Sequence, residues 1–487
     1  MRMKYIVRHL GHLPKRTYWL LLVEFVLVLT TVVAIASYLP NQAAQAATLT
    51  NWSTFLGSNA RTGYNAAETI INPTTAPNLK LHWTASTAKQ AKATDEVIIA
   101  NGTLYWGSWD GILHASDPAT GKDIWTASLG TQPGGCSNKP HGVVGSAAVA
   151  TVLINGVGTS IVFVAAGQSN LYALNAHTGT ILWRTNLGTN PAEFLYSSTA
   201  VYKGSVYVGV ASTGDCPLVQ GEVVQVNAST GQIQHTFKVV PDGGCLGGSV
   251  WGSPTIDEQS GKLYVVTGNA DKLSCTQPMP LGQAVVELNA ADLSLVASWQ
   301  VPSSDLVGKD DDFGSTPTLF QATINSVSHA MVGMVSKDGY YYALDRTKIS
   351  AGPLWKVRIS VGGSAPATDA SIASSAYDGT GLYAAGSLTT IGGHQCVGSL
   401  QKLNPNTGTV LWADCLNGSV LAPTLAVPGL VVVGAGNSMD VVDSQTGRIL
   451  FTYTDTTTNG DFWGAATISG GILYDESKSG KLFAFGL

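Results

Sequence analysis

Polar residues gather in five short segments of the chain, and several of them have side chains that can do chemistry. The segments are Ala211–Cys216, Trp251–Asp257, Thr267–Asn269, Asp310–Gly314 and Ser336–Arg346. Together they hold carboxylates, an amide, an ammonium group and an indole ring. A carboxylate can remove a proton from a hydroxyl group, and carboxylate and amide oxygens are ligands that hard cations prefer. The segments are therefore candidates for one functional site, provided that the fold brings them together.

A repeated phrase indicates how the chain positions these segments. An apolar strand ends at an Asp or Asn, Thr-Gly follows, and a second strand carries an aromatic residue four positions after the Gly. The Asp or Asn can accept hydrogen bonds from the amides ahead of it and the Gly can take a positive φ, so the phrase closes a tight hairpin. Clear copies are Asp117–Trp125, Asn175–Trp183 and Asn404–Trp412, and weaker ones begin at Asn227, Asp345 and Asp443.

Self-similar units of four short strands are typical of a β-propeller. We count eight units, which begin near residues 95, 144, 196, 251, 313, 370, 420 and 461. The last unit lacks a fourth strand, whereas Leu79–Trp83 near the N-terminus is a strand without a unit. We therefore predict an all-β, eight-bladed propeller of four-stranded antiparallel blades over residues 79–487, in which the two chain ends share one blade and so remove an exposed sheet edge.

The five polar segments mostly follow the inner strands of the third to fifth blades. Loops from several blades converge near the axis of a propeller, so we expect these segments to lie there. The repeat itself does not require their polar residues, and a departure from uniformity in a repeat protein is a candidate for function.

The N-terminal residues predict a membrane anchor or a signal peptide. Residues 1–17 carry five basic side chains, which favours a cytoplasmic position, and residues 18–39 form an apolar run that contains only Glu24. The run is longer than a usual signal-peptide core, but Ala44–Ala46 is a plausible cleavage site. Residues 40–78 are expected to form a linker and an N-terminal arm. Either alternative puts the propeller outside the cell membrane, anchored by a single pass or secreted.

The net charge argues against one class of partner, and the cysteine content suggests disulfide bonds. Residues 1–47 carry five basic and one acidic side chain, and the whole chain has a net charge of −5, which leaves −9 on the remainder. Such an acidic body is a poor match for nucleic acid. The six cysteines all lie in this remainder, where an even number suggests disulfides. We expect Cys216–Cys245 and Cys396–Cys415, each flanking a Thr-Gly hairpin, and by elimination Cys136–Cys275.

Phrases in the polar segments resemble those of the quinoprotein dehydrogenases, which are eight-bladed propellers that hold pyrroloquinoline quinone (PQQ) and Ca²⁺ on the axis. Asp312–Pro317 and Lys337–Tyr340 are most similar to the polyvinyl-alcohol dehydrogenase branch. The resemblance extends from Asn51–Phe55 to the C-terminus. It implies an extracytoplasmic enzyme that oxidises an alcohol or polyol.

The resemblance also implies roles for five residues. Asp312 matches the catalytic base, Trp251 the ring beneath the quinone, and Lys337 the cation against the quinone oxygens. Asn269 matches a Ca²⁺ ligand. The second ligand is generally a Glu in the family, and the nearest carboxylate here is Asp215, which is shorter and displaced by a few residues. The adjacent-cysteine disulfide of the alcohol-oxidising members has no counterpart.

Each of these residues also has a structural alternative. Asp310 replaces Asp312 as the base if the loop register shifts, and the whole acidic run is alternatively a solvated loop. Asn269 suits an ordinary turn, and Lys337 begins a good hairpin turn. Trp251 is alternatively a ring that packs between blades.

Two functions therefore remain open. The first is a PQQ-dependent alcohol dehydrogenase. The sequence has no Cys-x-x-Cys-His haem motif, so the enzyme would pass electrons to a separate cytochrome or to a membrane quinone. The second is a non-catalytic propeller that binds proteins at the cell envelope. The dehydrogenase requires Trp251, Asn269, Asp312 and Lys337 to converge in one pocket, whereas a scaffold does not.

Overall fold

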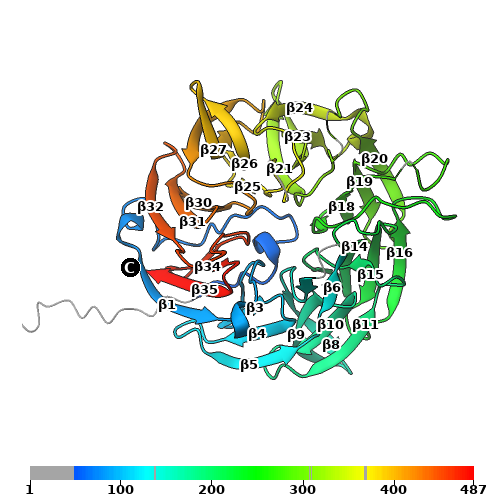
Figure 1. The fold of residues 1–487 in the computed structure, drawn as a ribbon, viewed down its shortest axis with the longest axis horizontal. Helices are drawn as coiled ribbons and strands as arrows, with labels where there is room; N and C mark the ends of the chain where they lie inside the picture. Colours follow the sequence, from blue (N-terminus) through cyan, green and yellow to red (C-terminus); the bar gives the residue numbers. More distant parts are fainter. Residues whose placement is uncertain (1–48, 136–138, 272, 307, 309, 367–369) are drawn as a thin grey trace, which may run out of the picture. The chain divides into compact units, whose positions relative to one another are not determined.

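Antiparallel strands arranged around one axis form the computed structural model of this chain (Figure 1). The structure describes residues 49–487 except 136–138, 272, 307, 309 and 367–369. Residues 49–487 form one unit, and residues 1–48 are a separate unit. The predicted basic segment 1–17 and apolar run 18–39 lie outside the described residues. In the described part of the chain, no helix is both long and apolar enough to cross a membrane.

Eight antiparallel sheets surround the axis in the described part of the chain, which confirms the predicted eight-bladed all-β propeller. From the innermost strand outward, the first four blades are β2 (Ile98–Ala100), β3 (Thr103–Gly107), β4 (Ile112–Ser116) and β5 (Asp123–Ser128); β8 (Ala148–Ile154), β9 (Val157–Ala166), β10 (Asn170–Asn175) and β11 (Ile181–Asn186); β13 (Ala200–Tyr202), β14 (Ser205–Ser212), β15 (Glu222–Asn227) and β16 (Ile233–Lys238); and β17 (Thr255–Asp257), β18 (Lys262–Val266), β19 (Ala284–Asn289) and β20 (Leu295–Gln300).

The remaining blades repeat the same order. They are β21 (Thr318–Ile324), β22 (Val327–Val335), β23 (Tyr340–Asp345) and β24 (Pro353–Arg358); β25 (Ala376–Tyr377), β26 (Leu382–Ile391), β27 (His394–Leu403) and β28 (Val410–Leu416); β29 (Leu425–Val427), β30 (Leu430–Ala435), β31 (Ser438–Asp443) and β32 (Ile449–Thr454); and β33 (Thr467–Ser469), β34 (Ile472–Ser477), β35 (Lys481–Gly486) and β1 (Lys80–Ser86).

Short elements decorate these blades. β12 (Glu193–Phe194) extends the third blade by pairing with β14, and β6 (Gln132–Gly134) pairs with β7 (Lys139–His141). Four 3₁₀ turns lie entirely within the described residues, and they are η2 (Phe55–Gly57), η3 (Ala76–Asn78), η4 (Ala88–Gln90) and η6 (Ile349–Ala351).

The two chain ends close the ring, as predicted. β1 pairs with β35 in antiparallel register from Lys80 opposite Gly486 to Ser86 opposite Lys481. The eighth blade therefore takes three strands from the C-terminus and its outermost strand from the N-terminus, which removes one unpaired edge.

The repeated aromatic residue links neighbouring blades. The Trp125 ring lies against Gly179 in the turn of the next blade, where a Cβ atom would come within 2.6 Å of the ring. Its Nε1–H donates to the carbonyl of Ala176 in the same turn, at 3.1 Å. Rings equivalent to Trp125 donate to the next turn in the same way, and they are Trp83, Trp183, Trp355 and Trp412. The Thr-Gly phrase is thus both a hairpin turn and the docking point for the preceding blade.

Residues 50–65 close one end of the axis, and we call this segment the axial plug. Its members hydrogen-bond to the second residue of the innermost strand in every blade, and these partners are Ile99, Val149, Val201, Ile256, Leu319, Tyr377, Ala426 and Ile468. Most of these bonds use backbone groups, for example Ile256 N–H to the Asn59 carbonyl at 2.8 Å and Tyr377 N–H to the Thr62 carbonyl at 2.8 Å. In Figure 1 the segment crosses the centre of the ring in blue.

A buried arginine of the axial plug and a buried glutamate beside the plug hydrogen-bond between the plug and the blades. Arg61 has no exposed surface and donates to the carbonyls of Phe55, Thr199 and Pro254. Glu96 is also fully buried, and it accepts hydrogen bonds from the plug through Trp52 Nε1–H and Leu56 N–H. Burial lowers the pKa of Arg61 to about 10, although the charge of Glu96 opposes that change, so the guanidinium group stays charged at neutral pH.

One predicted disulfide is confirmed and two are wrong. Cys396 pairs with Cys415 across β27 and β28, as expected from their positions around the Thr-Gly hairpin. Cys245 pairs with Cys275 instead of Cys216, with Cα atoms 5.0 Å apart, so Cys275 is not available to Cys136. The loop after β18 brings Cys275 beside Cys245, which lies in the loop after β16. The prediction of Cys216–Cys245 from the sequence considered only cysteines that flank the same hairpin. Cys216 is also disulfide-bonded.

Candidate functional site

A cavity of about 510 Å³ lies at the end of the axis opposite the axial plug. Seven of its lining residues occupy one repeated position, four residues before the innermost strand of a blade, and they are Thr94, Val144, Tyr196, Trp251, Ile372, Leu421 and Trp463. The plug binds the second residue of the same strands. Because each innermost strand separates these two positions, the cavity and the plug lie at opposite ends.

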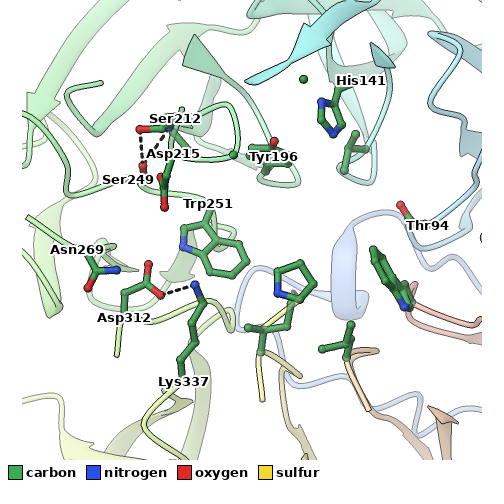
Figure 2. Close-up of a pocket in the computed structure, with 18 of the residues that line it drawn as sticks. Thr94, His141, Tyr196, Ser212, Asp215, Ser249, Trp251, Asn269, Asp312 and Lys337 are labelled. Carbon is green, nitrogen blue, oxygen red and sulfur yellow. Dashed lines mark hydrogen bonds and ion pairs between the residues drawn. The ribbon is translucent and has the colours of Figure 1, made fainter. Parts of the chain in front are cut away.

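The cavity brings together all five residues that the sequence predicts for the site (Figure 2). Asp215, Trp251, Asn269, Asp312 and Lys337 all line it. Trp251 and Asp312 precede innermost strands, while the other three follow the second strands of their blades. Adjacent strands in an antiparallel sheet run in opposite directions, so the start of the first strand and the end of the second meet at one edge. The blade topology therefore explains the convergence.

Lys337 is the electrostatic centre of this group. Its Nζ atom lies 2.7 Å from Oδ1 of Asp312 and 3.1 Å from both carboxylate oxygens of Asp310. The Lys337 side chain is 6% exposed and that of Asp312 is 4% exposed. Burial alone would lower the pKa of Lys337, but the charges of Asp312 and Asp310 outweigh it and raise that pKa, so the ammonium is charged.

Asp312 is a buried carboxylate that lines the cavity, and the Lys337 ammonium holds its Oδ1 atom at 2.7 Å. Burial raises the pKa of Asp312 to about 7, although the charge of Lys337 opposes the change and that of Asp310 adds to it. A carboxylate with a pKa near neutrality is suited to proton transfer.

The two candidate bases differ in their positions. Asp312 is among the residues that line the cavity, while Asp310 bonds the lining residues Asn269 and Lys337.

The Trp251 ring leans from the fourth blade over the fifth. The repeated lining position in the fifth blade is Gly314, where a Cβ atom would come within 2.2 Å of the indole. Lys337 Nζ lies 4.8 Å from the centroid of the ring. The glycine therefore leaves room for the ring to lie flat across a blade boundary with one face toward the cavity (Figure 2).

Asn269 is held in place by two polar neighbours. Its Nδ2 donates to Oδ1 of Asp310 at 2.8 Å, and its Oδ1 accepts from Nε2 of Gln283 at 2.9 Å. Gln283 belongs to no recognisable sequence motif, so only its contact with Asn269 in the fold shows that it is part of the site. Burial raises the pKa of Asp215. The positive charge of Lys337 opposes this rise, and the negative charge of Asp310 adds to it. Among the described residues, no group of three His, Cys, Asp or Glu side chains is arranged to hold a metal.

Aromatic side chains line the other half of the cavity, which the sequence analysis missed. The His141 ring lies 4.6 Å from Trp109 and 5.8 Å from Tyr196, measured between centroids, and Trp463 completes the wall. Burial lowers the pKa of His141 to about 4, and the charge of Lys92 adds to the effect. Their position in the repeat could have revealed these aromatic residues from the sequence, because Tyr196 and Trp463 occupy in their blades the place that Trp251 occupies in the fourth blade.

With the fold and the cavity defined, comparison with known proteins gives the family. Residues 52–361 match the family described as glucose/ethanol/alcohol dehydrogenase, beta-propeller domain, and the chain belongs to this family. Residues 337–487 also match a family model described as outer membrane protein assembly factor BamB. The predicted membership of the PQQ-dependent dehydrogenase repeat family is confirmed.

Individual relatives agree with this assignment. Polyvinylalcohol dehydrogenase of Sphingopyxis sp. (strain 113P3) is 24% identical over 468 residues, which are 82% of this chain and 68% of that protein. Quinohemoprotein alcohol dehydrogenase of Comamonas testosteroni is 25% identical over 344 residues, 62% of this chain and 46% of that protein, so this chain spans less than half of it. Its crystal structure gives a TM-score of 0.73 at 17% identity, covering 91% of this chain and 81% of that chain, and shows the same fold.

Proposed function

We propose that this protein oxidises an alcohol or polyol with PQQ and Ca²⁺ bound in the cavity opposite the axial plug. The observation that carries the proposal is the convergence of Asp215, Trp251, Asn269, Asp312 and Lys337 in one cavity. A scaffold propeller has no need of a buried Lys that faces two carboxylates beside an exposed indole face.

The cavity fits a flat quinone. Its volume of about 510 Å³ lies within the range of small-molecule and cofactor sites. Trp251 presents a face on which an aromatic ring system can stack, and Gly314 behind it keeps the indole flat. Lys337 is charged and lies 4.8 Å from the centre of the same indole, so its ammonium is close to a molecule stacked there.

The donors also fit a hard cation. Asp215 supplies carboxylate oxygens, and Oδ1 of Asn269 has a second lone pair beside the one that Gln283 uses. These two residues would hold Ca²⁺ together with oxygens of the quinone, since the described acidic and histidine side chains do not form a complete cage. When bound, the quinone with its metal supplies the oxidant, which accepts the hydride that leaves the alcohol carbon.

Asp312 is proposed as the base that takes the hydroxyl proton of the alcohol. Asp312 lines the cavity, so its carboxylate would be placed to accept a hydrogen bond from a substrate hydroxyl. Lys337 holds this carboxylate at 2.7 Å and stabilises its ionised form, while burial favours the protonated form. The two opposing effects keep the carboxylate able to receive a proton and to release it.

A dye-linked assay of alcohol oxidation tests this function after the protein is incubated with PQQ and Ca²⁺. Asp312→Asn is expected to lower kcat by about 10²–10⁴-fold, because it removes the base. Asp305→Asn is the matched control, since Asp305 pairs with Lys356 outside the cavity, and it should retain wild-type activity. Equal activity of Asp312→Asn and wild type would contradict the proposal.

Electron transfer and location follow the same proposal. The chain carries no haem motif, so the electrons would pass to a separate cytochrome or to a membrane quinone. The N-terminal residues would place the propeller outside the cell membrane, anchored through residues 18–39 or secreted.

The BamB match over residues 337–487 supports the alternative of an envelope scaffold. That alternative would hold if the protein binds neither PQQ nor Ca²⁺.

A further inference from the structure

An ammonium group without an ion-pair partner among the described residues lies against two aromatic rings that line the cavity. Lys92 Nζ lies 4.1 Å from the ring centroid of Trp109 and 5.6 Å from that of Trp463, and both rings line the cavity. No ion pair between the described residues includes Lys92. Its side chain is partly buried, so the charge has lost some of its hydration.

Neighbouring charges do not compensate Lys92. Lys478 lies 3.8 Å over the Trp463 ring, but its ammonium is paired with Asp461 at 2.7 Å. Burial lowers the pKa of Lys92, and the charges of Lys478 and Lys139 lower it further while that of Asp461 opposes them. Beside the Trp463 ring, Lys92 and Lys478 thus bring two ammonium groups against one carboxylate, that of Asp461. An anion that entered this end of the cavity would relieve the excess positive charge.

His141 adds a second, independent sign of a ligand. Its side chain is 9% exposed and lines the cavity, and its Nδ1 atom has no hydrogen-bond partner among the described residues. Because its pKa is low, the imidazole is neutral at physiological pH and offers one donor and one acceptor. Figure 2 shows this ring projecting into the cavity across from the group formed by Asp312 and Lys337.

We propose that the end of the cavity formed by Lys92, Trp109, His141 and Trp463 binds a carboxylate group of the ligand. Lys92 is the counter-ion and His141 a hydrogen-bond partner. The carboxylate comes from one of two sources, the alcohol substrate or the quinone. In the first case the preferred substrates are hydroxy acids rather than neutral alcohols. This inference rests on the proposed function for the identity of the ligand, but the anion subsite itself can be tested without a quinone.

The first test uses the quinone-free protein. Iodide, an anionic quencher, is compared with neutral acrylamide by tryptophan fluorescence at low ionic strength. Lys92→Met keeps the side-chain packing on the two indoles but removes the charge. It is expected to lower iodide quenching about twofold and to leave acrylamide quenching unchanged. Lys203→Met is the control, because Lys203 lies 5.0 Å over the Tyr202 ring, outside the cavity.

Competition then identifies the chemistry of the anion. Glycolate should displace iodide from the wild-type protein, whereas its neutral isostere glycolamide should not. If iodide quenches Lys92→Met and wild type equally and glycolate does not compete, the subsite is overturned. A failure to bind PQQ would leave this result unaffected, so the two proposals can fail separately.

Two further measurements on the PQQ-loaded protein distinguish the sources of the carboxylate. If the substrate supplies it, Lys92→Met lowers kcat/KM for glycolate and lactate at least tenfold and changes that for glycolamide and lactamide less than twofold. If the quinone supplies it, the same variant raises the Kd of PQQ at least tenfold and leaves the ratio of acid to amide unchanged. If neither value changes, the subsite has no role in ligand binding and the proposal is wrong.

Discussion

The two ends of the propeller axis use buried charges in opposite ways. At the closed end, Arg61 donates to backbone carbonyls of the axial plug and the blades, beside Glu96, which accepts from the plug. At the open end, Lys337 pairs with Asp312 and Asp310, and both Lys337 and Asp312 line the cavity. Hydrogen bonds to the backbone surround the buried polar groups of the closed end, whereas the charged groups of the open end border a cavity.

This difference separates structure from chemistry in one ring of repeats. A buried charge that is fully hydrogen-bonded contributes to a fixed conformation, whereas a charged group that borders a cavity is available to a ligand. The plug also makes the cavity accessible from one end only, since it hydrogen-bonds to the innermost strand of every blade.

Removal of the charge at the closed end should produce the largest effect on stability. Arg61→Met leaves the buried carbonyls of Phe55, Thr199 and Pro254 without their donor. We expect the free energy of unfolding to fall by about 3–5 kcal/mol, measured by denaturant titration, because each buried acceptor left unsatisfied costs about 1–3 kcal/mol. Arg448→Met, at an exposed turn, is the control and should change it by less than about 0.5 kcal/mol. A small effect of Arg61→Met would mean that the plug is not needed for stability.

The matching change at the open end should affect binding instead. Trp251→Ala removes the ring face over Gly314, and we expect the Kd of PQQ to rise at least about tenfold, or about 1.4 kcal/mol. Trp412 bonds the Ser444 carbonyl of the next blade, so Trp412→Ala should destabilise the fold with little effect on the Kd. If the two variants bind PQQ equally well, Trp251 is a packing residue.

Gly314→Ala sharpens the same contrast with a smaller change. The new Cβ atom would lie 2.2 Å from the Trp251 ring, so the indole must tilt into the cavity. We expect a loss of about 1–3 kcal/mol in stability together with a several-fold rise in the Kd of PQQ. In Gly158→Ala the Cβ atom meets only Thr151 at 3.5 Å, and neither quantity should change. An unchanged Kd in Gly314→Ala would show that the indole does not form the floor of the ligand site.

A further effect depends on pH and comes from groups between the two ends. Asp95 and Glu476 are buried carboxyl groups that lie close enough to affect each other's pKa. Burial raises the pKa of Asp95 to about 7 and that of Glu476 well above its ordinary value. The folded state therefore binds more protons than the unfolded state above about pH 4, and stability falls as pH rises through about 7.

Denaturant titrations at pH 5 and pH 9 measure this dependence. The slope reaches about 1.4 kcal/mol per pH unit for each proton that only the folded state retains. Glu476→Gln should reduce the slope, because it removes a titratable group whose pKa burial raises. Glu258→Gln, a change in an exposed residue elsewhere in the ring, should preserve it. Identical slopes in wild type and Glu476→Gln would contradict the attribution of the pH dependence to this group.

Local repeats made the fold and half of the site predictable. Gly179 marks a hairpin turn and also the place where the Trp ring of the preceding blade docks, and Trp183 docks in the same way on the next blade. The repeat therefore predicts how neighbouring blades connect. The same repeat predicts that Trp251 and Lys337 meet, because strand direction fixes which loops share an end of the axis.

Long-range contacts explain what the sequence could not give. The plug is made largely of backbone hydrogen bonds, for which Asn59 and Thr62 need no distinctive side chain. Cys245 meets Cys275 rather than Cys216 because two loops of different blades adjoin. Lys92 and His141 come from irregular connections, and only the closed ring places them opposite Asp312.

Titration of the purified protein with PQQ, with and without Ca²⁺, tests the central claim that the open end of the axis is a cofactor site. Absorbance and tryptophan quenching would follow binding directly, because even 100-fold excess over Kd adds only about 2.7 kcal/mol to stability. Our account predicts saturable binding at micromolar PQQ that requires Ca²⁺ and is lost in Asn269→Ala but not in Asn406→Ala, which alters a turn outside the cavity. No binding at these concentrations, or equal binding by Asn269→Ala, would contradict it.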